Sequence, residues 1–131
     1  MELGQYTGIQ ADLFAAGVIL FVMYTGTPPF LSTKNTDKIY RLIREKNFPK
    51  FWALHEKKKP AGFYPDSFKR LINSFFSAEV EKRPTFESLK EDEWLGGDQA
   101  MQNDIQLEMK ARYAKMLADD VNKQKVEKAK V

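Results

Sequence analysis

Apolar side chains recur at helical spacing in several segments of the chain, and the first segment, about residues 7–25, has no polar face at all. Thr7 with Gln10 three residues later is typical of a capping box at a helix start. Gly26 and the prolines that follow it predict a turn at the other end. A helix that is apolar all round must be covered on every side. We therefore predict a fully surrounded helix here.

The next segments are amphipathic. Residues 36–46 and 66–77 each place their apolar side chains on one helical face. Residues 48–65, which lie between them, contain Pro49, Pro60 and Pro65, which predicts a long irregular connection. A further helix is predicted to begin at Pro84 and to turn three side chains inward, Phe86, Leu89 and Trp94. No segment has the period of two that a strand requires, so the pattern predicts an all-α fold.

The composition changes after Gly96 and Gly97, because residues 98–131 contain neither proline nor glycine. Apolar residues recur there every four positions, at Met101, Ile105, Met109, Tyr113, Leu117 and Val121. This predicts an amphipathic helix over about 100–121, followed by a disordered lysine-rich end. Four-residue spacing drifts by about 40° per step on a helix, which favours docking on the preceding residues over a long coiled coil. We divide the chain into residues 1–95 and a charged helical tail, 96–131.

Composition narrows the class of protein. The 131 residues suit one domain, and 43% apolar against 30% charged residues allow a sizeable core. A net charge of +3 gives no indication of nucleic-acid binding, and no cysteine with a single histidine leaves little for a disulfide or zinc site. The start of the chain lacks a signal peptide, and Leu13–Tyr24 is shorter than the roughly 20 residues of a membrane span. An intracellular, cytoplasmic protein is expected.

Two sequence blocks carry a family resemblance. YTGIQADLFAAGVILFVMYTGTPPF contains Asp12 and Gly17 at the spacing of an Asp-x-Trp-Ser-x-Gly pattern, with Phe14 and Ala15 in place of Trp and Ser. EKRPTFESLKEDEWL contains the Lys-Arg-Pro-Thr block around Arg83. Together they resemble the C-terminal part of a eukaryotic protein kinase domain, of the calcium/calmodulin-dependent Ser/Thr type, over about residues 1–95. The resemblance implies a helical C-lobe fragment, helices F to I, plus the appended tail helix.

The resemblance also implies roles for single residues. Asp12 would anchor the catalytic loop, and Arg83 would pair with the glutamate of an Ala-Pro-Glu motif. Neither partner lies in this sequence, so we expect both charges to be unpaired. Ile19 and Met23 would support a hydrophobic stack that reaches the adenine, with plain core packing as the alternative. A substrate or docking surface, or else a simple turn, is implied for Pro28, Pro29 and Phe30.

The implied parent reaction is ATP- and Mg-dependent phosphorylation of protein Ser or Thr. The sequence contains no glycine-rich loop, His-Arg-Asp or Asp-Phe-Gly, and the Ala-Pro-Glu would fall before Met1. We predict that the chain supplies scaffold and substrate-side surface, with no catalytic, cofactor-binding or metal residues, and is inactive alone. A non-catalytic kinase-remnant interaction module and a truncated gene model remain alternatives.

The expected partners are the missing N-terminal part of the kinase domain and the protein substrate of the parent kinase. For the tail, packing on the lobe or in a short coiled coil is favoured over a calmodulin-type target, because acidic residues such as Asp104 and Glu108 interrupt its positive charge. The Lys57–Lys59 run is expected to be a solvated loop, with a phosphate or acidic partner as the alternative.

Overall fold

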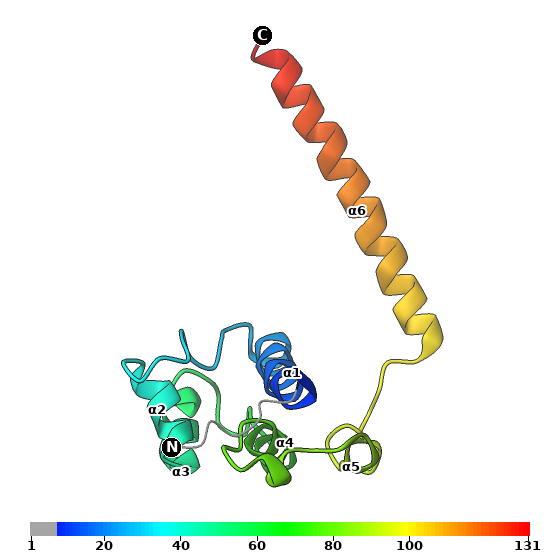
Figure 1. Ribbon diagram of the computed structural model, residues 1–131. Coiled ribbons are helices and arrows are strands. Elements are labelled where there is room, and N and C mark those ends of the chain that lie inside the picture. Colours follow the sequence, from blue (N-terminus) through cyan, green and yellow to red (C-terminus); the bar gives the residue numbers. More distant parts are fainter. Residues whose placement is uncertain (1–7) are drawn as a thin grey trace. The chain divides into compact units, whose positions relative to one another are not determined.

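The computed structural model describes residues 8–131 (Figure 1). Within that range the chain forms α-helices and a single 3-10 turn, without a strand, which confirms the all-α prediction. The elements are α1 (Gly8–Thr25), α2 (Lys38–Arg44), α3 (Phe48–Glu56), α4 (Asp66–Phe75), η1 (Val80–Lys82), α5 (Phe86–Lys90) and α6 (Gln102–Ala129). They fall into two compact units, one ending at Gly97 and the other beginning at Asp98, which are described separately.

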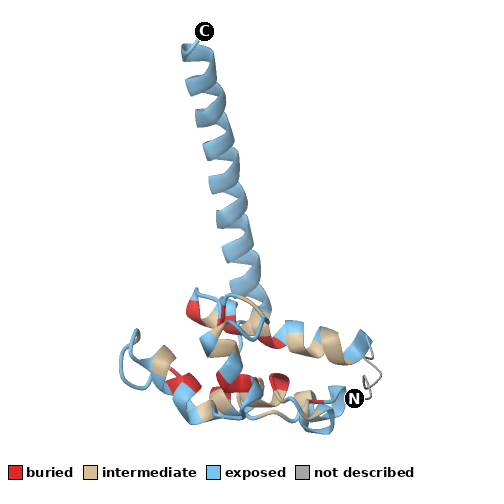
Figure 2. Ribbon diagram, turned by 60° about the vertical axis from the view of Figure 1, so that its left-hand side comes forward, coloured by how far each residue is buried: buried red, intermediate tan, exposed pale blue. Residues whose placement is uncertain are grey.

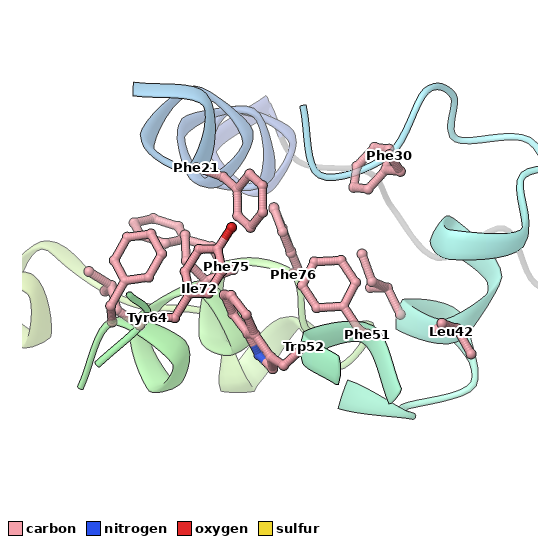
Figure 3. Packing of buried hydrophobic residues seen from close by; sticks show 12 residues of the cluster. Phe21, Phe30, Leu42, Phe51, Trp52, Tyr64, Ile72, Phe75 and Phe76 are labelled. Carbon is pink, nitrogen blue, oxygen red and sulfur yellow. The ribbon is translucent and has the colours of Figure 1, made fainter. Parts of the chain in front are cut away.

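The core of the first unit lies where α1, α3 and α4 meet (Figure 3). The apolar face that the sequence gives to α4 is buried through Phe68, Leu71, Ile72 and Phe75. Phe68 and Ile72 are fully buried. Burial of a side chain of this size contributes about 1.5–3 kcal/mol to the stability of the fold. Helix α4 is therefore a main contributor to the stability of this unit.

Helix α1 meets this core along one side only. Phe21 is fully buried, and Gly17 lies so close to α4 that an added Cβ would be 2.5 Å from Cβ of Phe75. The opposite side is open, with Ile19 and Met23 58% and 72% exposed. The expectation of a helix covered on every side therefore does not hold for the described residues. The predicted Thr7 cap lies outside them.

Helix α1 is also long and apolar enough, by length and composition, to cross a membrane, and 17% of it is buried. One such helix is a weak indication, because a core helix of a soluble protein passes the same test.

The prediction of an irregular connection over residues 48–65 is wrong in its first half, where α3 forms. The Asn47 side chain accepts a hydrogen bond from Lys50 N and caps the helix. Pro49 falls in the first turn, where the missing N–H costs no helical hydrogen bond. Phe51 and Trp52 are buried, and the Trp52 indole donates to Asn73 over 2.8 Å. A proline at this position starts a helix instead of breaking one.

Helix α5 begins later than predicted. Thr85 is its N-cap and exchanges side-chain hydrogen bonds with Ser88, while Pro84 lies buried before the helix. Phe86 is 69% exposed, so its predicted inward orientation is wrong, whereas Leu89 and Trp94 pack against the core. The helix ends at Lys90, so Trp94 reaches the core from the turns that follow it.

Helix α6 is the second unit's single element, 28 residues long, and all of its residues are exposed (Figure 2). Asp104 accepts a hydrogen bond from the N–H of Met101 at its start, and Glu108 pairs with Arg112 one turn on at 2.6 Å. The helix continues to Ala129, so the predicted disorder after Val121 is wrong. Helix-favouring lysine, glutamine and alanine without a glycine or proline account for the extension. Docking of its apolar stripe stays a prediction.

Candidate functional site

The open side of α1 brings Asp12 together with apolar neighbours. Asp12, Ile19 and Met23 follow at intervals of seven and four residues, which places them on one face of the helix. Ile9, 66% exposed, lies near the start of the same side. Asp12 is exposed, and its carboxylate has no hydrogen bond or ion pair with any residue from 8 to 131. The predicted anchor and stack residues thus share one uncovered surface.

Arg83 behaves differently, because backbone carbonyls accept hydrogen bonds from it, although no carboxylate among residues 8–131 forms an ion pair with it. Its Nε donates to the carbonyl of Ser77 over 2.9 Å, and Nη1 donates to the carbonyl of Gln10 over 2.8 Å. The guanidinium also lies 5.6 Å from the ring centroid of Phe14. Because a carbonyl oxygen has two lone pairs, Gln10 can accept this bond in addition to a helical one. Arg83 ties the start of α1 to the segment before α5.

A groove of about 380 Å³ lies beside this contact. Ile9 and Leu13 of α1 form one wall, and Val80 and Phe86 with Arg83 form the other. The exposed ring of Phe86, which the sequence pattern assigned to the core, therefore lines an apolar groove next to the open side of α1.

The predicted docking residues separate into surface and support. Pro28 is exposed, whereas Pro29 and Phe30 are buried. The Phe30 ring packs on Tyr40 with 5.2 Å between centroids. The Pro29 carbonyl accepts a hydrogen bond from His55 Nε2 over 3.0 Å, which fixes the proton of the neutral ring on that nitrogen. A surface role stays a prediction for Pro28. The contacts of the buried Pro29 and Phe30 fix the position of the loop.

Burial lowers the pKa of His55, since the ring packs against Phe21 and Phe51. The hydrogen bond to Pro29 opposes this shift, and the charge of Lys58 adds to it. The neutral ring is therefore the form that the folded chain favours. Its role is to join α3 to the loop that follows α1.

Asp37 is the residue with the densest polar contacts, and the sequence analysis overlooked it. Its Oδ1 accepts the N–H groups of Ile39 and Tyr40, and its Oδ2 accepts those of Leu31 and Ser32, at 2.9–3.0 Å. Burial opposes the charge, but these four bonds together lower the pKa of the carboxyl below its usual value. An aspartate directly before an apolar-periodic segment is an N-cap signal that would have identified it.

The Lys57–Lys59 run is not uniformly solvated. Lys59 Nζ donates to the carbonyl of Thr25 over 2.9 Å and lies 4.9 Å from the centroid of the Phe63 ring. A cation at the end of α1 is favoured by the helix dipole. Lys57 and Lys58 are exposed, as expected.

Residues 8–131 contain no group of three acidic or histidine side chains that could hold a metal ion. The arrangement around α1 is therefore one of surfaces: an uncovered apolar face with a carboxylate, a neighbouring groove, and a loop held by Asp37 and His55.

Comparison with known proteins identifies the family. Residues 3–95 match the family described as "Protein kinase domain". A calcium and calcium/calmodulin-dependent serine/threonine-protein kinase of Pisum sativum is 29% identical over 109 residues, 83% of this chain and 19% of the relative. The corresponding kinase of Lilium longiflorum is 33% identical over 104 residues, 78% of this chain and 18% of the relative.

The human serine/threonine-protein kinase DCLK2 is 28% identical over 120 residues, 89% of this chain and 15% of the relative. The chain thus spans about a fifth or less of the length of the curated relatives it matches. No solved structure matches it. The helical unit with its Asp12 and Arg83 blocks is C-lobe-like, and the chain belongs to the protein kinase domain family.

Proposed function

We propose that this chain works as the C-lobe part of a protein serine/threonine kinase, an intracellular enzyme that transfers phosphate from ATP to Ser or Thr of proteins. Residues 1–95 supply the lobe, and residues 96–131 form a tail outside it. Family membership supports the enzyme class. The observation that carries the proposal is the open side of α1, where the Asp12 carboxylate, without a partner among residues 8–131, lies among exposed apolar side chains.

A carboxylate beside apolar side chains is costly to bury without hydrogen-bond donors. The polypeptide that covers this side must therefore bring donors to Asp12 and apolar groups to Ile19 and Met23. We propose that the cover is the kinase part that carries the catalytic loop, with Asp12 as its anchor and the two apolar residues as support for the stack beneath the adenine. The groove beside Arg83 would receive an adjoining segment of the same part.

We assign no step of phosphate transfer to this chain's own side chains. ATP and Mg would be held by the covering part, because residues 8–131 contain no acidic cluster for the metal. The names of the Pisum sativum and Lilium longiflorum relatives include calcium and calmodulin. A calmodulin-like partner for α6 is the less favoured proposal, since Asp119 and Asp120 lie within its sequence.

Two measurements test this function. Calorimetry of the chain with ATP·Mg is expected to show no saturable binding, and micromolar binding would overturn the division of roles. The DNA upstream of Met1 is expected to continue in frame into Ala-Pro-Glu and Asp-Phe-Gly.

The longer polypeptide encoded there should phosphorylate a Ser/Thr peptide, and Asp12→Ala should abolish that activity, because the catalytic loop loses its anchor. Asp119→Ala on α6, which removes an exposed carboxylate outside the lobe and off the apolar stripe, is the control and should leave the activity intact. Full activity of the Asp12→Ala variant would contradict the anchor role.

A further inference from the structure

Positive charge is concentrated in one segment of the chain. Residues 34–59 contain nine Lys and Arg against three Asp and Glu, a net charge of +6, whereas the whole chain carries +3. Two of the three acids are engaged: Asp37 by four backbone N–H groups, and Glu56 by Lys69. Among the cations, Lys46 pairs with Glu79 and Lys59 donates to the Thr25 carbonyl, and the other seven still leave a surplus of positive charge.

Helix α2 arranges part of this charge on one side. Lys38, Arg41 and Arg44 follow at three-residue intervals and are all exposed, while the opposite side is buried through Leu42 and Ile43. Lys34, in the loop before the helix, is also exposed. We refer to Lys34, Lys38, Arg41 and Arg44 as the α2 basic face.

The two arginines of this face line a shallow hollow of about 290 Å³ together with Asn35 and Glu45. The Asn35 side-chain carbonyl accepts a hydrogen bond from Arg44, which holds that guanidinium in place. A guanidinium presents a planar set of donors that matches a carboxylate, and two of them beside one hollow can take an acidic side chain between them.

Leu31 adds an apolar contact next to the basic face. Its side chain is 89% exposed, although its backbone is fixed on both sides. Its N–H and that of Ser32 donate to Asp37 over 2.9 and 3.0 Å, and Phe30 before it is buried. The loop therefore holds a leucine in water at a defined place, a few residues from Lys34.

We propose that the α2 basic face and Leu31 form a docking surface for a carboxylate-rich protein segment that carries an apolar residue. Its acidic side chains pair with the cations of α2, one of them in the Arg41–Arg44 hollow, and its apolar residue packs on Leu31. The negative charge of Glu45 in the hollow disfavours a continuous polyanion such as RNA. Single-stranded RNA also needs open aromatic rings on which its bases stack, whereas Tyr40, the aromatic residue of α2, is half-buried and packs on Phe30. The surface shares no residue with the open side of α1 or with the groove beside Arg83, so the inference goes beyond the proposed kinase role.

The test is fluorescence anisotropy of a short labelled peptide of Asp and Glu with one central Leu, titrated with the full chain. We expect saturable binding that weakens as salt is raised from about 50 to about 500 mM, because exposed charge pairs are screened. Arg41→Gln with Arg44→Gln should weaken binding about tenfold, and Leu31→Ser about threefold.

A second pair keeps the result independent of the Arg44–Asn35 bond. Lys34→Gln with Lys38→Gln leaves that bond intact and should weaken binding about threefold. The matched control is Lys110→Gln with Lys115→Gln, which removes the same charge from α6 and should leave binding unchanged. Replacing the leucine of the peptide by serine should weaken binding by the same factor as Leu31→Ser.

Three results would overturn the proposal: absence of saturable binding, equal weakening by the α6 control pair, or tighter binding of heparin or an RNA oligomer that Leu31→Ser does not affect. The first result would mean that the surface does not bind such a segment. The second would mean that binding depends only on the net charge of the chain. The third would mean that the surface binds another class of polyanion. None of them bears on ATP binding, so the proposed kinase role is tested separately.

Discussion

Helices α1 and α4 pack against each other, yet their sequences relate to their surroundings in opposite ways. The polar side of α4 faces out and its apolar side is buried, so pattern and burial agree. Helix α1 is apolar on both sides, and its Ile19–Met23 side is exposed. The comparison teaches that a hydrophobic pattern identifies the apolar faces of a helix, whereas it does not reveal which of them the rest of the chain covers.

The largest difference between the two helices should appear in stability. Phe68→Ala removes a fully buried ring of α4 and should lower the free energy of unfolding by about 3–5 kcal/mol. Ile19→Ala on the open side of α1 should change it by less than about 0.5 kcal/mol. Urea unfolding of the full chain, followed by circular dichroism, measures both. A loss above about 1 kcal/mol for Ile19→Ala would mean that the open side is covered within this chain.

The contact between the two helices can be probed at Gly17. A methyl group there would meet the side chains of Phe75 and Phe76 at 2.5–3.1 Å, so Gly17→Ala should lower the free energy of unfolding by about 2 kcal/mol despite alanine's higher helix propensity. Gly8→Ala, at the first residue of α1, is the control, because a methyl group there would meet nothing within 4 Å. A stabilised Gly17→Ala variant would show that α1 and α4 can move apart without loss.

Two charged residues of this unit, Arg83 and Asp12, should also differ in how much they contribute to the free energy of unfolding. Arg83→Met removes hydrogen bonds to Gln10 and Ser77 and should lower the free energy of unfolding by about 1.5 kcal/mol. Asp12→Asn removes a charge without a partner among residues 8–131 and should stay within about 0.5 kcal/mol. Equal effects of the two changes, again measured by urea unfolding, would contradict the different contacts described for them.

Sequence reasoning reached the helical fold and the family, because α2 and α4 have strong apolar periodicity, the α1 segment is a nearly continuous apolar run, and the Asp12 and Arg83 blocks are specific. It failed where a local cap outweighs a helix breaker, as at Asn47 and Pro49 of α3, and where a cap shifts a start, as at Thr85. It could not find the Gln10–Arg83 bond, since nothing in a pattern reveals which carbonyl lies beside a guanidinium 73 residues away.

The smallest effect concerns two aspartates of this unit, one with donors and one without. Asp37→Ala should lower the free energy of unfolding by about 1 kcal/mol at pH 7, because four backbone N–H groups lose their acceptor, whereas Asp12→Ala should change little. The pKa of the Asp37 carboxyl is lowered from 3.8 in the folded chain, so the unfolded chain binds the proton first as the pH falls.

The stabilisation by Asp37 is therefore fully present above pH 3.8 and is lost as the pH falls through the lowered pKa. Urea unfolding of the parent chain and of Asp37→Ala at pH 7 and at about pH 3 measures this. The difference between the two should shrink toward acid pH. A constant Asp37 difference across this range would mean that the loop and α2 are held by contacts other than its carboxylate. In that case the position of Leu31 would also be fixed by contacts other than the hydrogen bond to Asp37.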